Sequence, residues 1–198
     1  IIGCGGLGST CSTILSRSGV GHLILVDDDI VSLSNIHRQF LYTHADVGKF
    51  KCESAAVSPL LCLSKNTPVN VHATTEEINK LIIQYQPCVV MDCTDNFEVR
   101  YAINKACVDH SLPMVYGSVT GEEGQVSVFC HTKENPNCPC FACKYPEMPK
   151  TLGKPPPVIP GICSFVATIQ AQQAISLITG VGNVLAGYMV TVNLFKLK

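Results

Sequence analysis

The sequence predicts a doubly wound α/β fold whose sheet is mostly parallel. Short apolar runs alternate with segments of helical period. A glycine-rich loop joins the end of the first strand to a helix, and an acidic residue ends the next apolar run. This alternation is typical of parallel strands covered by helices on both faces. The chain has 198 residues, of which 46% are hydrophobic and 15% charged. We therefore expect residues 1–198 to form one well-buried domain.

The N-terminal half supplies the parallel strands and the helices between them. Its apolar runs are continuous, and its helical segments repeat apolar residues every three or four positions. Ile1–Ile2 has the pattern of a strand end, so we expect the chain to be truncated at its N-terminus. The polar stretch Asp28–Gly48 predicts a long functional loop or short helices. The expected strands are His22–Asp27, Asn70–Ala73 and Cys88–Cys93, and the expected helices are Ser9–Gly19, Lys51–Leu63 and Glu76–Tyr85.

The C-terminal half adds a different kind of strand and a proline-rich connection. The alternating pattern of Gly124–Cys130 indicates a more exposed, antiparallel strand. Prolines recur through residues 135–160, which predicts an extended, mobile crossover loop. The remaining expected helices are Glu98–His110 and Ser164–Thr179, and the remaining expected strands are Pro113–Tyr116 and Tyr188–Leu197.

Composition excludes several classes of protein. Lys and Arg total 14 against 15 Asp and Glu, so no basic surplus exists for a nucleic-acid backbone. The apolar run at His22–Val26 is far shorter than the ~20 residues that span a bilayer, so we expect no membrane partner. The chain has twelve cysteines, no signal-peptide pattern, and several cysteines inside apolar runs, which favours a reducing, cytoplasmic location over a secreted disulfide scaffold. Those cysteines are Cys62, Cys88, Cys93 and Cys107.

The glycine loop has the pattern of a nucleotide-binding turn. Glycines at such a turn let backbone N–H groups approach phosphate at the positive end of a helix. Asp27 ends the next strand, where an acid would accept hydrogen bonds from ribose hydroxyls. A tight packing turn is the alternative interpretation, and NAD would be the default ligand. The glycines of the loop are Gly3, Gly5, Gly6 and Gly8.

Polar and cationic residues further along favour a triphosphate over a dinucleotide. Asn35, Arg38 and Gln39 follow Asp27, and Lys51 begins a helix soon after. Cations that converge on phosphates can neutralise charge during reaction, which hydride transfer does not require. Each cation taken alone could equally be a solvated surface charge.

A second acidic motif, Asp92-Cys93-Thr94-Asp95-Asn96, follows the strand at Cys88–Cys93. The carboxyl ends of strands form the ligand crevice of an open α/β sheet. Asp95 could therefore hold Mg²⁺ against phosphate oxygens, since Mg²⁺ is usually bound by one or two carboxylates and substrate phosphates. The alternative is that Asp95 caps the following helix.

Together these motifs resemble the ThiF/MoeB/HesA family, the prokaryotic-type relatives of ubiquitin-activating enzymes, over essentially the whole chain. The resemblance implies a Rossmann-like fold, a homodimer, and adenylation by Mg·ATP of the C-terminal glycine of a ubiquitin-like sulfur carrier (ThiS/MoaD-like). It implies that Gly6 lies against the nucleotide, that Asp27 binds ribose, and that Gln39 supports the phosphate site. It assigns the phosphates to Asn35, Arg38 and Lys51 and the magnesium to Asp95, with Arg38, Lys51 and Asp95 as the catalytic residues.

Cys140 and Cys143 form a C-x-x-C pair, which is half of a tetrahedral zinc site. The resemblance implies a second cysteine pair beyond Lys198, so we expect truncation at the C-terminus too. A redox-active pair and two simple thiols are the alternatives, and Cys138 could compete for the metal.

Two further features of the family are missing here. No cysteine occupies Pro149–Pro157, where many relatives carry one that links covalently to the carrier, and Cys163 is the nearest candidate. The arginine that relatives donate across the dimer from a preceding helix lies outside this sequence. A catalytically silent partner subunit and an NAD-dependent oxidoreductase are the competing functions.

Overall fold

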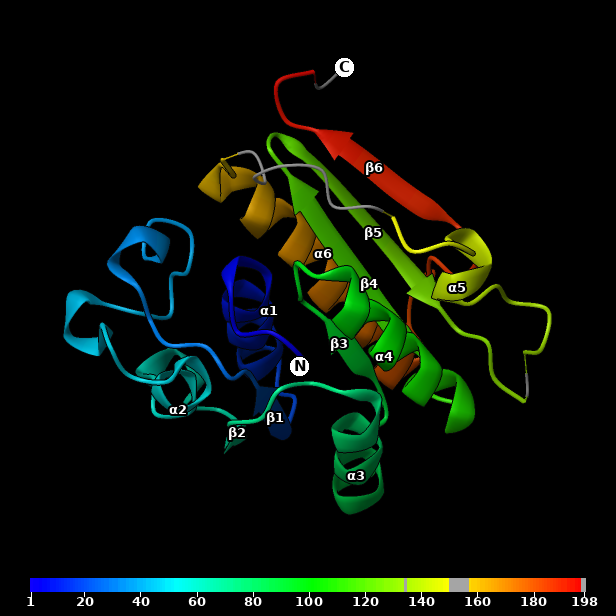
Figure 1. Ribbon diagram of the computed structural model, residues 1–198, viewed down its shortest axis with the longest axis horizontal. Coiled ribbons are helices and arrows are strands. Elements are labelled where there is room, and N and C mark those ends of the chain that lie inside the picture. Colours follow the sequence, from blue (N-terminus) through cyan, green and yellow to red (C-terminus); the bar gives the residue numbers. More distant parts are fainter. Residues whose placement is uncertain (134, 150–156, 197–198) are drawn as a thin grey trace.

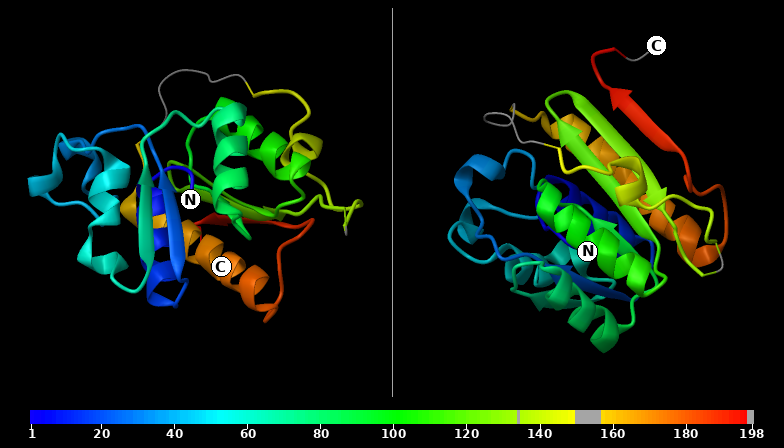
Figure 2. Two further views of the ribbon diagram at one scale, coloured as in Figure 1. Left: turned by 90° about the horizontal axis from the view of Figure 1, so that it is seen from below. Right: turned by 45° about the vertical axis from the view of Figure 1, so that its right-hand side comes forward.

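The computed structural model describes residues 1–133, 135–149 and 157–196. It confirms the predicted fold class, because helices cover both faces of a mixed sheet (Figure 1). Helices α1 and α6 lie on one face, and α3 and α4 lie on the other (Figure 2). The helices are α1 Gly6–Arg17, α2 Lys51–Ala56, α3 Thr75–Tyr85, α4 Phe97–Asp109, α5 Phe141–Lys144 and α6 Pro160–Thr179. The strands are β1 His22–Val26, β2 Lys65–Val69, β3 Val90–Asp92, β4 Met114–Thr120, β5 Glu123–Phe129 and β6 Met189–Asn193.

The sheet has a parallel half and an antiparallel half. Strand β1 pairs with β2 and β3 with β4 in parallel, while β4, β5 and β6 pair antiparallel. Ile2 joins the pair β1–β2 to the strands β3–β6, because it bridges Val26 of β1 and Asp92 of β3 in parallel. The residues that follow Ile2, β1 and β3 therefore meet at one edge of the sheet. A mainly apolar cleft of about 500 Å³ lies toward the opposite edge, beside Ile1.

Several element boundaries differ from the sequence-based predictions for local reasons. The strand expected at Asn70–Ala73 is instead β2, a polar edge strand that contains Pro68. An edge position tolerates a residue without an N–H, and its weak burial removes the apolar signal. Helix α2 ends at Ala56 instead of Leu63, because Pro59 disfavours helix at the residue before it and begins a 3₁₀ turn.

The proline-rich segment contains one unexpected element, the short helix α5. Residues 150–156 of this segment lie outside the described part of the chain, so its mobility stays a prediction. Two cysteines that were predicted to be buried are exposed, because Cys62 follows a 3₁₀ turn and Cys88 precedes β3. Cys93 and Cys107 are buried, as predicted.

Helix α6 fills the core beneath the sheet. Among the described helices it alone is long and apolar enough to span a membrane, but half of its most apolar window is buried inside the protein. It packs on α1, β4 and β5, and its Gln170 is fully buried. Gln170 Nε2 donates to the carbonyl oxygens of Asp92 at 2.8 Å and Val115 at 3.4 Å. These bonds fix α6 to the strands beside the functional edge, as expected of a core helix.

Candidate functional site

The glycine loop folds tightly against the end of β3. Gly3 has a φ of +89°, and a Cβ there would lie 2.6 Å from the carbonyl oxygen of Cys93. A Cβ on Gly8 would lie only 1.9 Å from the carbonyl oxygen of Gly3. Gly5 caps α1 without any side-chain hydrogen bond, so the first N–H groups of this helix are open to a ligand. Close backbone approach at an uncapped helix N-terminus is the geometry of an anion site.

Asp27 is anchored to this loop at the end of β1. Its Oδ2 accepts the N–H of Cys4 at 2.6 Å, and its Oδ1 accepts the N–H of Asp29 at 2.8 Å. Burial raises the pKa of Asp27, while these two hydrogen bonds and the charge of Lys51 oppose the rise. The carboxylate is thus held rigidly beside the glycines, and its remaining lone pairs can accept hydroxyl protons.

Lys51 is a buried cation at the start of α2. Its Nζ lies 2.7 Å from Oδ2 of Asp29, whose side chain is 73% exposed. Tyr42 ties this helix to the glycine loop, because its hydroxyl donates to the carbonyl oxygen of Cys4 at 2.7 Å and lies 3.3 Å from that of Lys51. Burial raises the pKa of Tyr42 far above its usual value, so it stays a donor. An exposed carboxylate is a partner that a phosphate group can replace.

Arg38 and Gln39 belong to the segment after the 3₁₀ turn Leu33–Asn35. This segment approaches the N-terminal end of α1. Arg38 Nη2 donates to Oδ1 of Asn35 at 3.1 Å, so Asn35 orients the guanidinium. Among the described residues Arg38 has no carboxylate partner. Gln39 is buried beside Gly5, and its Oε1 has no hydrogen-bond partner there. A cation without a carboxylate partner in the described residues and a buried amide therefore lie on the segment that packs against Gly5 and Gly6.

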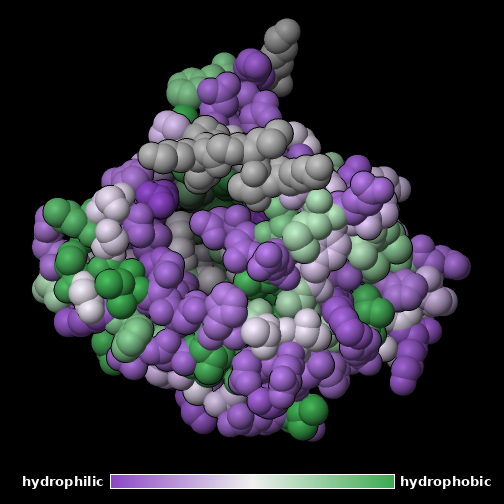
Figure 3. Space-filling model, in the orientation of Figure 1, coloured by the Kyte–Doolittle hydropathy of each residue, from purple (hydrophilic) through white to green (hydrophobic). Residues whose placement is uncertain are grey.

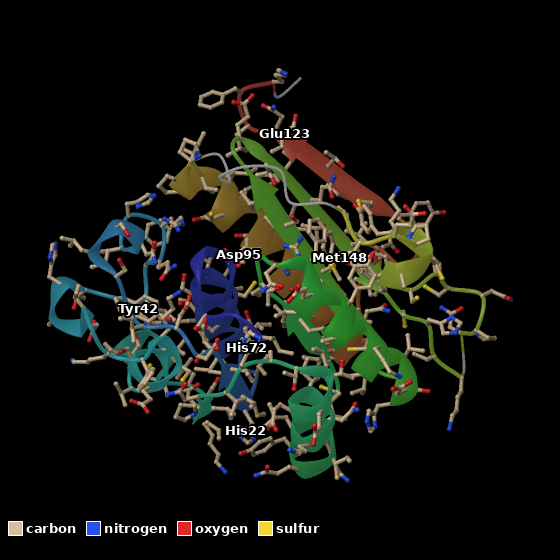
Figure 4. All side chains as sticks on the ribbon, in the orientation of Figure 1. His22, Tyr42, His72, Asp95, Glu123 and Met148 are labelled. Atoms are coloured by element: carbon tan, nitrogen blue, oxygen red, sulfur yellow. The ribbon has the colours of Figure 1, made fainter. Side chains whose placement is uncertain are left out.

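The two aspartates at the carboxyl end of β3, Asp92 and Asp95, have different environments. Asp92 is fully buried, accepts the hydroxyl of Thr94 at 2.7 Å and pairs with Arg100 at 3.5 Å. Asp95 is exposed at the carboxyl end of the strand and lies by the N-terminal end of α1 (Figure 4). Asn96 caps α4, with its Oδ1 accepting the N–H of Val99 at 3.0 Å. The interpretation of Asp95 as the helix cap is therefore wrong, and its carboxylate can bind a cation.

The structure thus brings together the glycines, Asp27, Asn35, Arg38, Gln39, Lys51 and Asp95 at one sheet edge. The surface is hollowed over the N-terminal end of α1, with hydrophilic side chains around it (Figure 3). Sequence reasoning missed Asp29 and Tyr42. Asp29 lies two residues after Asp27, and this closeness in sequence could have indicated that it belongs to the site. No sequence signal identifies Tyr42.

The two thiols of the C-x-x-C pair lie close together. The Sγ atoms of Cys140 and Cys143 lie 3.5 Å apart, close to the ~3.8 Å expected of two thiolates at ~2.3 Å from one tetrahedral zinc. Burial opposes ionisation of Cys140, but hydrogen bonds from Cys143 and Asn104 outweigh it and lower the pKa of this thiol. In the described part of the chain no third His, Cys, Asp or Glu joins them. Two ligands are present, and they fit zinc.

Cys163 does not have the environment of a nucleophile. A Cβ on Gly6 would lie 3.1 Å from its Sγ, so the thiol packs directly against the glycine loop. Burial raises the pKa of Cys163, although the charge of Arg38 opposes this. A buried thiol that stays protonated reacts slowly.

Comparison with known proteins gives consistent results. The family model described as "ThiF family" matches residues 1–198. The chain is 36% identical to the adenylyltransferase and sulfurtransferase MOCS3-1 of Zea mays, with 96% of this chain and 40% of that protein covered. It is 35% identical to the molybdopterin-synthase adenylyltransferase of Escherichia coli strain K12, with 96% and 76% covered. It therefore spans about two fifths of the length of the MOCS3 relatives.

Solved structures share the fold. Escherichia coli MccB in a complex with succinimide has a TM-score of 0.82 at 21% identity, over 100% of this chain and 60% of MccB. MccB with ATP has a TM-score of 0.80 at the same identity and coverage. On the family match and on relatives above 30% identity, this chain belongs to the ThiF family.

Proposed function

We propose that this chain uses ATP to adenylate the C-terminal glycine carboxylate of a ubiquitin-like sulfur-carrier protein and releases pyrophosphate. The observation that carries the proposal is a pair of cations near the uncapped end of α1: the buried Lys51 ammonium, and the Arg38 guanidinium, which has no carboxylate partner among the described residues. A triphosphate would give Arg38 the anionic partner that it lacks and could replace the exposed Asp29 at Lys51. The names of the relatives as adenylyltransferases support it, and no observation favours an NAD-dependent oxidoreductase or a silent subunit.

In this proposal each polar group near the loop binds one part of ATP. The ribose hydroxyls donate to Asp27, which the N–H groups of Cys4 and Asp29 hold in place. The phosphates lie against the N–H groups that follow Gly5. Lys51 exchanges Asp29 for a phosphate oxygen, and Asn35 aims Arg38 at the same group.

Asp95 is the proposed ligand for Mg²⁺, which would neutralise phosphate charge when bound. Its carboxylate fits this role because it is exposed and has no hydrogen-bond partner among the described residues. Asn96, and not Asp95, caps α4, so the carboxylate of Asp95 is free of that role.

The proposed chemistry needs no general base. The terminal carboxylate of the carrier is already ionised at neutral pH, and its oxygen attacks the α-phosphorus in line. One oxygen–phosphorus bond forms as the bond to the leaving pyrophosphate breaks. Arg38 and Lys51 act by alignment and by stabilising the charge that moves onto pyrophosphate.

The test is carrier-dependent exchange of labelled pyrophosphate into ATP, measured for the wild-type chain and for Asp95→Asn. Loss of the magnesium ligand is expected to lower exchange by about 10²-fold or more, without a change in thermal stability, because Asp95 is exposed. The matched control is Glu98→Gln, an exposed acid in the first turn of α4. Absence of exchange with every ubiquitin-fold carrier would refute the proposed function, and wild-type exchange by Asp95→Asn would refute the role of Asp95.

We also propose that Cys140 and Cys143 bind zinc, together with a second ligand pair outside this sequence. Zinc would brace α5, the short helix between the two halves of the proline-rich segment. The full-length protein is expected to contain one equivalent of zinc by elemental analysis, and Cys140→Ser to contain almost none. Zinc content that is unchanged in Cys140→Ser would contradict this assignment.

Exposed apolar side chains support the further proposal of a homodimer. Large hydrophobic residues gather on the segment 28–50, which carries Asn35 and Arg38 and forms the left side of Figure 3. Burying such a patch against a second copy would stabilise the assembly. These residues are Ile30, Leu33, Phe40, Val47 and Phe50.

We propose that the protein is located in the cytoplasm. Its seven buried cysteines are free thiols, which supports a reducing compartment.

A further inference from the structure

Tyr42 is a buried residue that the proposed reaction does not use directly. It is 3% exposed and lies between α1 and α2 (Figure 4). A tyrosine hydroxyl in the core needs a hydrogen-bond partner, because an unpaired polar group there costs free energy. The oxygen atoms beside this hydroxyl are backbone carbonyl oxygens of the glycine loop and of α2. Tyr42 can therefore fix the relative position of these two elements.

The bond to the glycine loop completes the anchoring of one peptide from both sides. The N–H of Cys4 donates to Oδ2 of Asp27 at 2.6 Å, and the carbonyl oxygen of Cys4 accepts the hydroxyl of Tyr42 at 2.7 Å. Cys4 is only 2% exposed, so bulk water does not compete for these bonds. It stands between Gly3 and Gly5, the residue that caps α1. The placement of Asp27 and that of the proposed phosphate site therefore depend on the same peptide.

The same hydroxyl also reaches the backbone of the residue that carries the buried cation. It lies 3.3 Å from the carbonyl oxygen of Lys51. The N–H of Lys51 donates to the carbonyl oxygen of Asp29 at 2.9 Å. The side chain of Lys51 is only 6% exposed, so its ammonium group has little room to follow a displaced ligand. A shift of α2 relative to the glycine loop would thus weaken the contact of Lys51 with a phosphate group.

The backbone of Tyr42 adds the segment that carries Arg38. Tyr42 follows Arg38 by four residues, and its N–H donates to the carbonyl oxygen of Gln39 at 3.1 Å. Tyr42 thus connects the glycine loop, α2 and the segment with Arg38. Within the part of the chain that the structure describes, no other side chain hydrogen-bonds to the backbone of both the glycine loop and α2.

We propose that Tyr42 is a positioning residue for adenylation, which holds the ribose ligand and the phosphate ligands at the spacing that the transition state requires. The inference rests on the proposed function. In this role Tyr42 contacts neither the nucleotide nor the carrier and acts through Cys4 and Lys51. Alignment matters more in the transition state than in the ground state. A displaced Lys51 would therefore still bind a phosphate but would stabilise the leaving pyrophosphate less well.

The experiment removes only the hydroxyl, with Tyr42→Phe. In carrier-dependent pyrophosphate exchange, kcat is expected to fall about 30-fold and the KM for ATP to change less than about threefold. Ser64→Ala is the matched control, because the hydroxyl of Ser64 also donates to a backbone carbonyl oxygen, that of Val20, toward the opposite edge of the sheet. A wild-type kcat in Tyr42→Phe, or an equal loss in Ser64→Ala, overturns the proposal.

A double-mutant cycle with Lys51→Ala separates positioning from a general loosening of the fold. If Tyr42 acts through Lys51, its replacement by phenylalanine has little left to disturb once Lys51 is gone. The loss in kcat caused by Tyr42→Phe is then expected to shrink from about 30-fold to about threefold or less in the Lys51→Ala background. The same 30-fold loss in both backgrounds would mean that Tyr42 acts independently of Lys51 and would overturn the proposal. Thermal unfolding confirms that each variant is folded.

A second measurement separates this inference from the proposed function. If no carrier supports exchange by the wild-type chain, the proposed function fails, and amide hydrogen exchange followed by mass spectrometry decides on Tyr42. Faster exchange in Tyr42→Phe at both residues 3–8 and residues 51–56, with no such change in Ser64→Ala, supports the positioning of these elements by Tyr42. Unchanged exchange at the two segments overturns it.

Discussion

Replacing Arg38 with alanine is expected to lower carrier-dependent pyrophosphate exchange by about 10³-fold. The guanidinium has no carboxylate partner within the described residues, and its bond to Asn35 at 3.1 Å orients it. Its charge is therefore available to the phosphates and is worth most when charge moves onto pyrophosphate. The loss should appear in kcat more than in the KM for ATP, because Lys51 still binds the ground state.

Stability should hardly change in this variant. Arg38 is only partly buried, and its side-chain contacts other than that with Asn35 are long, at 3.4 Å to the carbonyl oxygen of Ser34 and 3.5 Å to Nε2 of His37. Thermal unfolding measures this. Arg17→Ala is the matched control, because Arg17 is an exposed arginine at the C-terminal end of α1, away from the glycine loop. Full exchange activity in Arg38→Ala, or an equal loss in Arg17→Ala, would remove Arg38 from the proposed mechanism.

The residues that could be placed from sequence are those whose position follows from backbone geometry. Gly3 and Gly8 are required where the chain passes within van der Waals distance of itself, and this requirement appears in the sequence as a pattern. Asp27 and Asp95 follow strands, and the ends of neighbouring parallel strands meet at one edge. Topology alone brings these residues together.

The parts that sequence reasoning missed depend on side-chain contacts between distant segments. Nothing in the sequence indicates that Tyr42 would hold Cys4 and Lys51 together, or that Asp29 would be the partner of Lys51. Asn96 and Asp95 are adjacent and both could cap a helix, so only the geometry shows that Asn96 does so. The edge strand β2 is polar, and edge strands lack the periodic burial that reveals central strands.

Replacing Arg100 with methionine is expected to lower the free energy of unfolding by about 3–5 kcal/mol. Methionine fills a similar space, but the fully buried Asp92 would lose its counterion 3.5 Å away. The carbonyl oxygens of Thr94 and Gly117 would lose a donor as well. Urea denaturation measures the change. A loss below 1 kcal/mol would mean that the pair is not needed to compensate the buried charge.

The pH dependence of the same variant identifies the cause. Burial raises the pKa of Asp92, and the charge of Arg100 opposes this rise. A carboxyl whose pKa is higher in the folded than in the unfolded state makes folding less favourable as pH rises through its folded value. Removal of Arg100 raises that pKa further, so Arg100→Met should lose more stability than the wild type does as pH rises above the usual carboxyl range. In the double variant Asp92→Asn/Arg100→Met this extra pH dependence should vanish, because no ionisable group is left at the position. If it persists there, another ionisable group causes the extra pH dependence, and the charge of Asp92 does not.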